Sequence, residues 1–504
     1  MSRQRPARPR RGQQVPLLEQ LRLLDEEQTE ANRVFEERRS LLLRQHAFPT
    51  PTGIQSVPPE ILAETFSHLV DGDSRNLIFP SHVCRLWRDV ILREAALWTC
   101  IHIGDRNESV VVALRFLKTC KQRARERSLS LSINNRKKLM SMGSFKNTFA
   151  VLTRTIRWES ISLTTSQIEE CVVFINDLPP SSIAAIKELS FSTSLDRPTG
   201  RPFGEKKSLD LQRFTALKAL TLDFPNPLSK IKGACSWDQL TDLKLTSRMH
   251  SVKLLAILRR CVSLENCSLS PDSSLDKIDL GKGERPPKKA RLLKLKKLEL
   301  VSEHIPFLLP ATLVCPILQE ATFFYKYDYG LDDSDDSDYD SESDLYQEAI
   351  ELKTFICKCA ETLRKLRVPG MFGNILRACL PKLNSLEELV VVAPYHNAEY
   401  WAMEECMDDC GIESFFPPLI ITSRSICLPR LRILQVLEQP NRTKDRVEDY
   451  IFEIAKSRMS GEKGVAHLER IILKTSSQRT QKLEKYRREY QEWESQGLLV
   501  DFDG

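Results

Sequence analysis

The chain has 504 residues, of which 41% are hydrophobic and 28% charged, and a formal net charge of +6. One compact core rarely extends over such a length, so we expect several domains or a repeat array. The small net charge argues against a nucleic-acid-binding protein, and no apolar run is long enough to cross a bilayer.

The cysteines and histidines give no sign of a metal or cofactor site. The fourteen cysteines are scattered without a Cys-x-x-Cys pair, and the eight histidines lie far apart. A zinc site needs closely spaced ligands, so we expect neither a metal nor a cofactor. No apolar signal-peptide core follows the N-terminus, so we expect reduced thiols and a cytoplasmic and/or nuclear location.

The N-terminal region predicts a tail and a helix. Residues 1–14 are rich in Arg and Pro, which predicts a disordered basic tail. Residues 15–48 predict one long helix with a seam at spacings of four and three, made of Leu17, Leu21, Leu24, Gln28, Ala31, Phe35, Arg38 and Leu42. A coiled coil through residues 15–46, by self-association or with a partner, explains this seam. A helix folded back on the rest of the chain explains it equally well.

Residues 54–103 predict a small, purely helical unit. Ser56 is a candidate N-cap before two prolines at a helix start. The first helix has an apolar stripe of Ile61, Leu62, Phe66 and Leu69, and the second helix has one of Val83, Trp87 and Val90. Asp71 to Ser74 separate the two helices, and Leu97-Trp98 close the unit.

This unit resembles an F-box. The family pattern appears as Val57-Pro58-Pro59-Glu60-Ile61-Leu62, Phe66-Ser67, Val83-Cys84-Arg85-Leu86-Trp87-Arg88 and Leu97-Trp98. Val57, Thr65 and Ala96 depart from the usual Leu, Ile and Pro. The alternative is a plain helical hairpin with aromatic core residues, since motif matches carry false positives.

The resemblance implies a partner, because F-boxes bind the Skp-type adaptor of a cullin-RING ubiquitin ligase. Carried over by position, the adaptor-binding residues are Pro58, Pro59, Glu60, Ile61, Leu62, Phe66, Leu69, Val83, Cys84 and Trp87. Because a partner site is an apolar patch on the surface, we expect Ile61, Leu62 and Leu69 to be partly exposed.

Residues 104–476 predict a repeat array. An apolar-x-x-apolar-x-apolar pattern recurs, mostly at intervals of about 23 to 31 residues, which is typical of leucine-rich repeats. We therefore predict an α/β fold: a long N-terminal helix and a small all-α F-box, followed by an irregular leucine-rich-repeat solenoid with a parallel sheet. The long helix before the F-box resembles the large family of mushroom (basidiomycete) F-box-like domain proteins. A set of unrelated α/β units is the alternative.

The pattern also predicts the orientation of each strand. Alternate residues point to opposite faces, so we expect an inward row of Leu189, Leu220, Leu243, Leu298, Leu366, Leu389 and Leu434. The intervening residues should form a concave face of Ser162, Ser190, Thr221, Lys244, Ser268, Glu299, Thr322, Arg367, Val390, Gln435 and Ile472. Its mixed charge fits a protein substrate, with Lys244, Glu299, Thr322, Arg367 and Gln435 as the candidate binding residues.

Three insertions and a C-terminal segment complete the chain. Residues 282–297 predict a basic loop containing a stretch that resembles a nuclear-import signal, and 332–344 predict an acidic disordered loop with serines near acidic residues. The insertion 393–430 contains enough aromatic residues to pack on the array. Residues 477–504 predict a helix, with Tyr486, Tyr490 and Trp493 on one face, followed by a tail.

No catalytic motif is recognisable, since the chain has neither a phosphate-binding loop nor a G-x-S-x-G elbow. The resemblance to an F-box implies instead a non-catalytic substrate-receptor subunit of a cullin-RING ubiquitin ligase. The alternative is a repeat scaffold for protein interactions in which the F-box-like segment is only structural. Neither alternative requires nucleic acid or a membrane.

Overall fold

The structure is a computed structural model. It describes residues 17–45, 57–104, 109–134, 149, 155–165, 168–193, 208–224, 231–232, 236–271, 288–302, 308–325, 341–369, 377–392, 416–422, 426–437, 447–461, 464–474 and 486–501. The predicted tail at 1–14 and most of the predicted acidic loop, 332–340, lie outside these residues.

The predicted N-terminal helix is α1, Leu17–Gln45. Side chains are described for residues 26–40, where Arg33 pairs with Glu30 at 2.7 Å and with Glu37 at 2.5 Å. Phe35, a residue of the predicted seam, is 66% exposed. The seam is thus unpaired in the single chain at this position, and the coiled coil stays a prediction.

Residues 57–104 form a small helical domain and the first strand of the sheet. Its elements are α2 (Pro59–Val70), η2 (Ser74–Leu77), η3 (Pro80–His82), α3 (Arg85–Arg93), η4 (Ala95–Trp98) and β1 (Cys100–Ile103). Asp71, in the left-handed conformation, ends α2, and Gly72 follows with φ 79°. The sharp reversal buries Phe66 and Leu77 in a core shared with Ile91 and Trp98.

A parallel sheet follows, and in the described residues it has 14 strands, each paired with the strands before and after it in the sheet. The strands are β1, β2 (Leu129–Asn134), β3 (Trp158–Thr165), β4 (Glu188–Thr193), β6 (Ala219–Asp223), β8 (Asp242–Met249), β9 (Asn266–Pro271), β11 (Lys297–Ser302), β13 (Glu320–Tyr325), β14 (Lys365–Pro369), β15 (Glu388–Val392), β16 (Ile433–Leu437), β17 (Arg470–Lys474) and β18 (Leu499–Asp501). The predicted mixed α/β fold with a large parallel sheet is confirmed.

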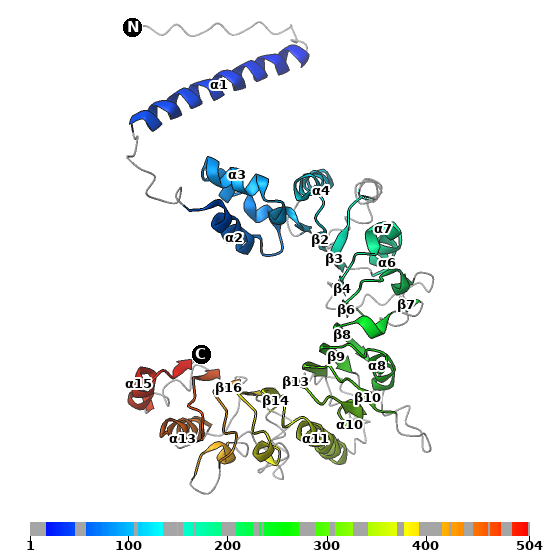
Figure 1. Ribbon diagram of the computed structural model, residues 1–504, viewed down its shortest axis with the longest axis vertical. Helices are drawn as coiled ribbons and strands as arrows, with labels where there is room; N and C mark the ends of the chain where they lie inside the picture. The colour runs from blue at the N-terminus through cyan, green and yellow to red at the C-terminus, as the bar shows by residue number, and fades with distance from the viewer. Residues whose placement is uncertain are drawn as a thin grey trace, which may run out of the picture.

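The sheet curves into an open arc with its strands on the inner side and most helices on the outer side (Figure 1). The helices after the first domain are α4 (Val110–Ala124), α6 (Ile168–Asn176), α7 (Pro180–Ile183), α8 (Ser251–Leu258), α10 (Leu308–Thr312), α11 (Ser341–Lys358), α13 (Val447–Met459) and α15 (Arg487–Ser495). Shorter 3-10 turns are η6 (Leu211–Arg213), η8 (Trp237–Gln239), η10 (Leu380–Lys382) and η14 (Pro417–Leu419). Two small sheets pair β5 (Leu209–Asp210) with β7 (Ile231–Lys232) and β10 (Ala290–Arg291) with β12 (Leu313–Val314).

The same backbone bonds recur where successive strands begin. The N–H groups of Thr241 and Asp242 both donate to the carbonyl of Lys218, at 2.9 and 3.0 Å. Glu265 and Asn266 then donate to Thr241 at 2.8 and 2.9 Å. This shared acceptor sets the register at the start of these strands. All seven leucines predicted to point inward are buried, so the predicted strand orientation is correct.

Four predicted boundaries need correction. β1 and β18 are strands of the sheet, although we assigned them to the helical unit and to the C-terminal tail. Residues 341–344 open α11 instead of belonging to the acidic loop. The predicted basic loop contains β10 and the buried Leu292 and Leu295. β1, β10 and β18 are strands because each pairs with another strand, and Leu292 and Leu295 are buried because they pack in the core.

Candidate protein-interaction site

The start of α2 is exposed and is capped by the backbone. Pro58 is the N-cap, with ψ 141°, and its carbonyl accepts from the N–H groups of Ile61 and Leu62, both at 3.1 Å. The predicted N-cap, Ser56, is therefore wrong, because the helix begins at Pro59. Pro58, Pro59, Glu60 and Ile61 are all exposed, and Ile61 is 56% exposed.

Two of the predicted adaptor-binding residues lie inside the domain. Leu62 is only 4% exposed and Phe66 is buried, with its ring 5.1 Å from that of Trp87 in an edge-to-face arrangement. Residues 62, 66 and 70 lie four apart on one face of α2, and this face meets α3. The expectation that Leu62 is exposed is therefore wrong. Cys84 and Trp87 are half-buried.

The turn between η2 and η3 adds apolar surface that the sequence reading missed. Phe79 is 77% exposed, and Ile78 is also exposed. Val83, a predicted adaptor-binding residue that follows η3, is exposed as well. The loop is held in place, because the Asn76 amide donates to the carbonyl of Val70 at 3.2 Å and the Arg88 guanidinium to that of Ser81 at 2.9 Å. The sequence contained a signal for this surface, because the apolar pair Ile78-Phe79 directly precedes Pro80 in the segment between the two predicted helices.

We define the α2–η3 apolar surface as Ile61, Leu69, Ile78, Phe79 and Val83. All five are large apolar residues with exposed side chains. Ile61 and Leu69 come from α2, and Ile78, Phe79 and Val83 flank η3. Exposed apolar side chains gathered on one small domain are typical of a partner-binding site.

The helical domain is fastened to the first part of the sheet by aromatic contacts. The Arg75 guanidinium lies 4.6 Å from the centre of the Phe116 ring on α4, and that of Arg123 lies 4.2 Å from the Trp98 ring. The Trp98 indole also donates to the carbonyl of Ile91 at 2.7 Å. The domain thus packs against α4 and continues directly into β1.

The central row of that inner face matches the predicted concave residues position by position. The strand register aligns Ser162, Ser190, Thr221, Lys244, Ser268, Glu299, Thr322, Arg367, Val390, Gln435 and Ile472. It also adds His102 and Ser132 at one end and Asp501 at the other.

Not every residue of this row is accessible. Val390 and Ile472 are each only 8% exposed, so they do not contribute to an open surface as expected. Gln435 is half-buried and donates to the Glu388 carboxylate at 3.1 Å. Lys244 is exposed and Glu299 and Arg367 are partly exposed, so the row is open in the middle of the sheet.

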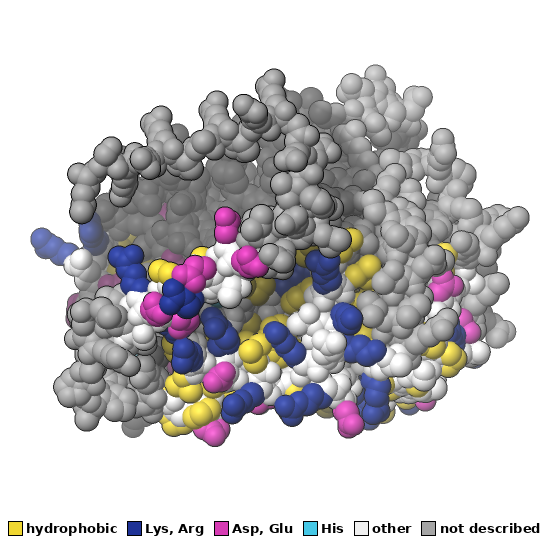
Figure 2. Space-filling model, turned by 90° about the horizontal axis from the view of Figure 1, so that it is seen from above, with side chains coloured by type: hydrophobic (Ala, Val, Ile, Leu, Met, Phe, Trp, Pro, Cys, Tyr) yellow, Lys and Arg dark blue, Asp and Glu magenta, His cyan; other side chains and the backbone are white. Residues whose placement is uncertain are grey.

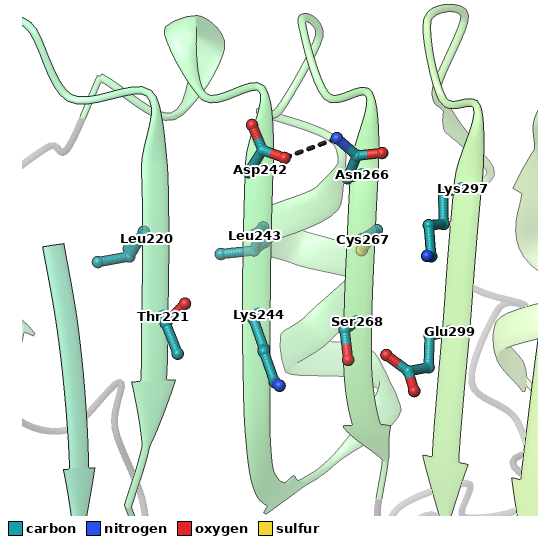
Figure 3. A pocket seen from close by; sticks show the side chains of 10 residues that line it. All are labelled: Leu220, Thr221, Asp242, Leu243, Lys244, Asn266, Cys267, Ser268, Lys297 and Glu299. Atoms are coloured by element: carbon teal, nitrogen blue, oxygen red, sulfur yellow. Dashed lines mark hydrogen bonds between the residues drawn. The ribbon is translucent and has the colours of Figure 1, made fainter. Parts of the chain in front are cut away.

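A shallow pocket of about 170 Å³ lies on this open part, between β6 and β11. Thr221, Lys244, Ser268 and Glu299 line one level of it, and Figure 3 shows their side chains in one row across the strands. Asp242 and Asn266 form another level and are joined by a hydrogen bond of 2.6 Å.

Acidic and basic side chains are interspersed over the described part of the face shown in Figure 2, without a large area of one sign. In the residues that the structure describes, no group of three His, Cys, Asp or Glu side chains is placed to hold a metal ion. Among the same residues, no helix combines the length and the apolar character needed to cross a membrane.

A family model of F-box-like domains matches residues 54–104. This range covers the helical domain with the α2–η3 apolar surface and ends just after β1. A comparison of the chain with curated proteins finds no match.

Proposed function

We propose that this protein is the substrate-receptor subunit of a cullin-RING ubiquitin ligase, and that its F-box-like domain binds a Skp-type adaptor. F-box domains typically bind such adaptors, and the match to residues 54–104 carries the proposal. The α2–η3 apolar surface supports it, because Ile61 and Phe79 leave large apolar areas in water that a partner would cover.

The sheet is, in this proposal, an irregular leucine-rich-repeat array that receives a protein substrate. Its strands are parallel and consecutive, and all of them except β18 bury at least two alternating apolar residues, as stacked repeats require. Lys244, Glu299, Thr322 and Arg367 remain candidate substrate contacts, and Gln435 is a weaker one because it already bonds to Glu388.

The protein itself contributes no catalytic group in this proposal. Transfer of ubiquitin to a substrate lysine would follow from proximity, because the ligase holds the charged conjugating enzyme near the bound substrate. No cofactor or metal is needed in this chain. The competing proposal is a non-ligase interaction scaffold, which would share the inner face but would not bind an adaptor.

Copurification separates the two proposals. The full-length tagged chain should retain a Skp-type adaptor and a cullin, identified by mass spectrometry. Ile61→Asp combined with Phe79→Asp should abolish this retention, because two charges would enter the contact, while the melting temperature should barely change. Val262→Asp changes an equally exposed apolar residue outside the domain and should retain the adaptor.

Two outcomes would contradict the proposal: no adaptor with the unmodified chain, or undiminished adaptor with the double variant. Leu62→Asp is not a valid probe of the contact, because Leu62 is buried and the change should unfold the domain.

A further inference from the structure

The open part of the inner face alternates long charged residues with short hydroxyl residues. Along the register, Thr221 is followed by Lys244, Ser268, Glu299, Thr322 and Arg367. We propose that this row binds an extended segment of the substrate with the pattern acid-x-x-base-x-x-acid, lying across the strands. This inference rests on the proposed role of the inner face as the substrate-binding surface.

The three charges of the row are available to a partner. In the described part of the chain, Lys244, Glu299 and Arg367 form no ion pair. The Arg367 guanidinium lies 5.6 Å from the centre of the Phe324 ring, and the Nε of Arg367 is buried without a hydrogen-bond acceptor.

The adjacent row, two residues earlier on each strand, is different because its charges neutralise one another. Lys297 pairs with Glu320 at 3.4 Å, and Lys365 pairs with Glu320 at 3.9 Å and with Glu388 at 3.4 Å. The sheet therefore pairs the charges of Lys297, Glu320, Lys365 and Glu388 internally. The charges of Lys244, Glu299 and Arg367 in the central row are left to an external partner.

The spacing of the free charges fits an extended chain. Lys244 on β8 and Glu299 on β11 are separated by one strand, and so are Glu299 and Arg367 on β14. Two strand spacings are about 9.5 Å. Three residues of a segment in the extended polyproline II conformation make one turn and span about 9.3 Å, so side chains at every third residue would all face the row. The charges of the row are positive, negative and positive, and this order is the same in both directions. The peptide could therefore bind with either chain polarity.

The short residues between the charges provide room for the segment. Ser268 separates Lys244 from Glu299, and Thr322 separates Glu299 from Arg367. The pocket of about 170 Å³ lies at the first of these gaps, over Ser268. A polyanion would meet Glu299 in the middle of the row, so the alternating signs favour a peptide with both charges over a phosphate polymer.

The test uses the full-length protein and displayed random peptides of about twelve residues. The unmodified chain should enrich acid-x-x-base-x-x-acid, and the triple variant Lys244→Glu, Glu299→Lys, Arg367→Glu should enrich base-x-x-acid-x-x-base. For a selected peptide, Lys244→Glu alone should weaken binding about fivefold or more at low salt, measured by fluorescence anisotropy. Lys253→Glu makes the same charge change on α8, on the outer side of the arc, and should leave the motif and affinity unchanged.

The proposal is overturned if no motif is enriched, if the charges recur at another spacing, or if the triple variant selects the same motif as the unmodified chain. Adaptor copurification is measured in parallel on the same proteins. A retained adaptor without a peptide motif would reject this inference alone. A peptide motif without a retained adaptor would reject the ligase assignment and keep the charge-patterned binding face.

Discussion

The guanidinium of Arg458 donates one hydrogen bond to the carbonyl of Leu428 at 3.1 Å and another to that of Cys427 at 2.7 Å. Arg458 is fully buried near the end of α13, and Leu428 has a φ of 51°, in the left-handed region. The arginine therefore fixes a strained turn just before β16. Burial lowers the pKa of Arg458 to about 10, so the side chain stays charged at neutral pH.

Arg458→Met should destabilise the protein by about 2–4 kcal/mol, because the two buried carbonyls lose their donor while the volume is kept. Lys456→Met, on the exposed side of α13, should cost less than about 0.5 kcal/mol. Urea unfolding of the two variants measures the difference. Equal stabilities would mean that the turn before β16 does not depend on Arg458.

Leu243→Ala should cost about 2–5 kcal/mol, since it leaves a cavity in the inward row. Lys244→Ala, one residue further on, should cost less than about 0.5 kcal/mol because its side chain is exposed. Chemical denaturation curves of both variants provide the measurement. A larger loss of stability for Lys244→Ala than for Leu243→Ala would show that the two faces of β8 are assigned wrongly. The charged row would then have no basis.

Gly104→Ala should destabilise the junction between the helical domain and the sheet. Gly104 has φ 108°, and a Cβ there would lie 2.0 Å from the carbonyl oxygen of Asn134 at the end of β2. Gly497→Ala is a matched control, because Gly497 has φ 99° but no atom within 4 Å of an added Cβ. Both changes should cost about 1 kcal/mol of backbone strain, and only Gly104→Ala should add a steric cost that lowers the melting temperature further.

Alkaline pH should destabilise the protein through its buried thiols. Burial raises the pKa of Cys359 and of Cys427 to about 11, and that of Cys120 to about 12, from an ordinary value of 9.0. The unfolded chain releases these protons first, so their contribution to stability is complete below pH 9 and is lost as pH rises through about 11.

Melting temperatures between pH 8 and 11 provide the measurement, with Cys120→Ala, Cys359→Ala, Cys427→Ala as the comparison variant. The variant should start less stable, because three cavities are created, and should lose less stability over this range than the unmodified chain. Parallel curves for the two proteins would show that other groups carry the alkaline transition.

The sequence by itself determined the strands and their faces. Each strand of the array has two apolar residues separated by one outward residue, and this two-residue period is a local property of the backbone. Leu220, Leu243 and Leu298 therefore lie inward as predicted, and Thr221, Lys244 and Glu299 lie in one row on the inner face. The helical domain could also be predicted from the sequence, because the residues of the F-box motif occur in order within a short stretch.

Only the tertiary structure decided which side chains are accessible. Leu62 and Ile61 are adjacent in one apolar stripe, but Leu62 lies against the core of the helical domain while Ile61 faces water. Val390 and Glu299 occupy equivalent positions in the central row, but only Glu299 remains accessible. β18 has no sequence signal that we recognised, and it is a strand because β17 offers it an unpaired edge. Burial and edge pairing depend on neighbours far away in the sequence, whereas the period of a strand depends only on its own residues.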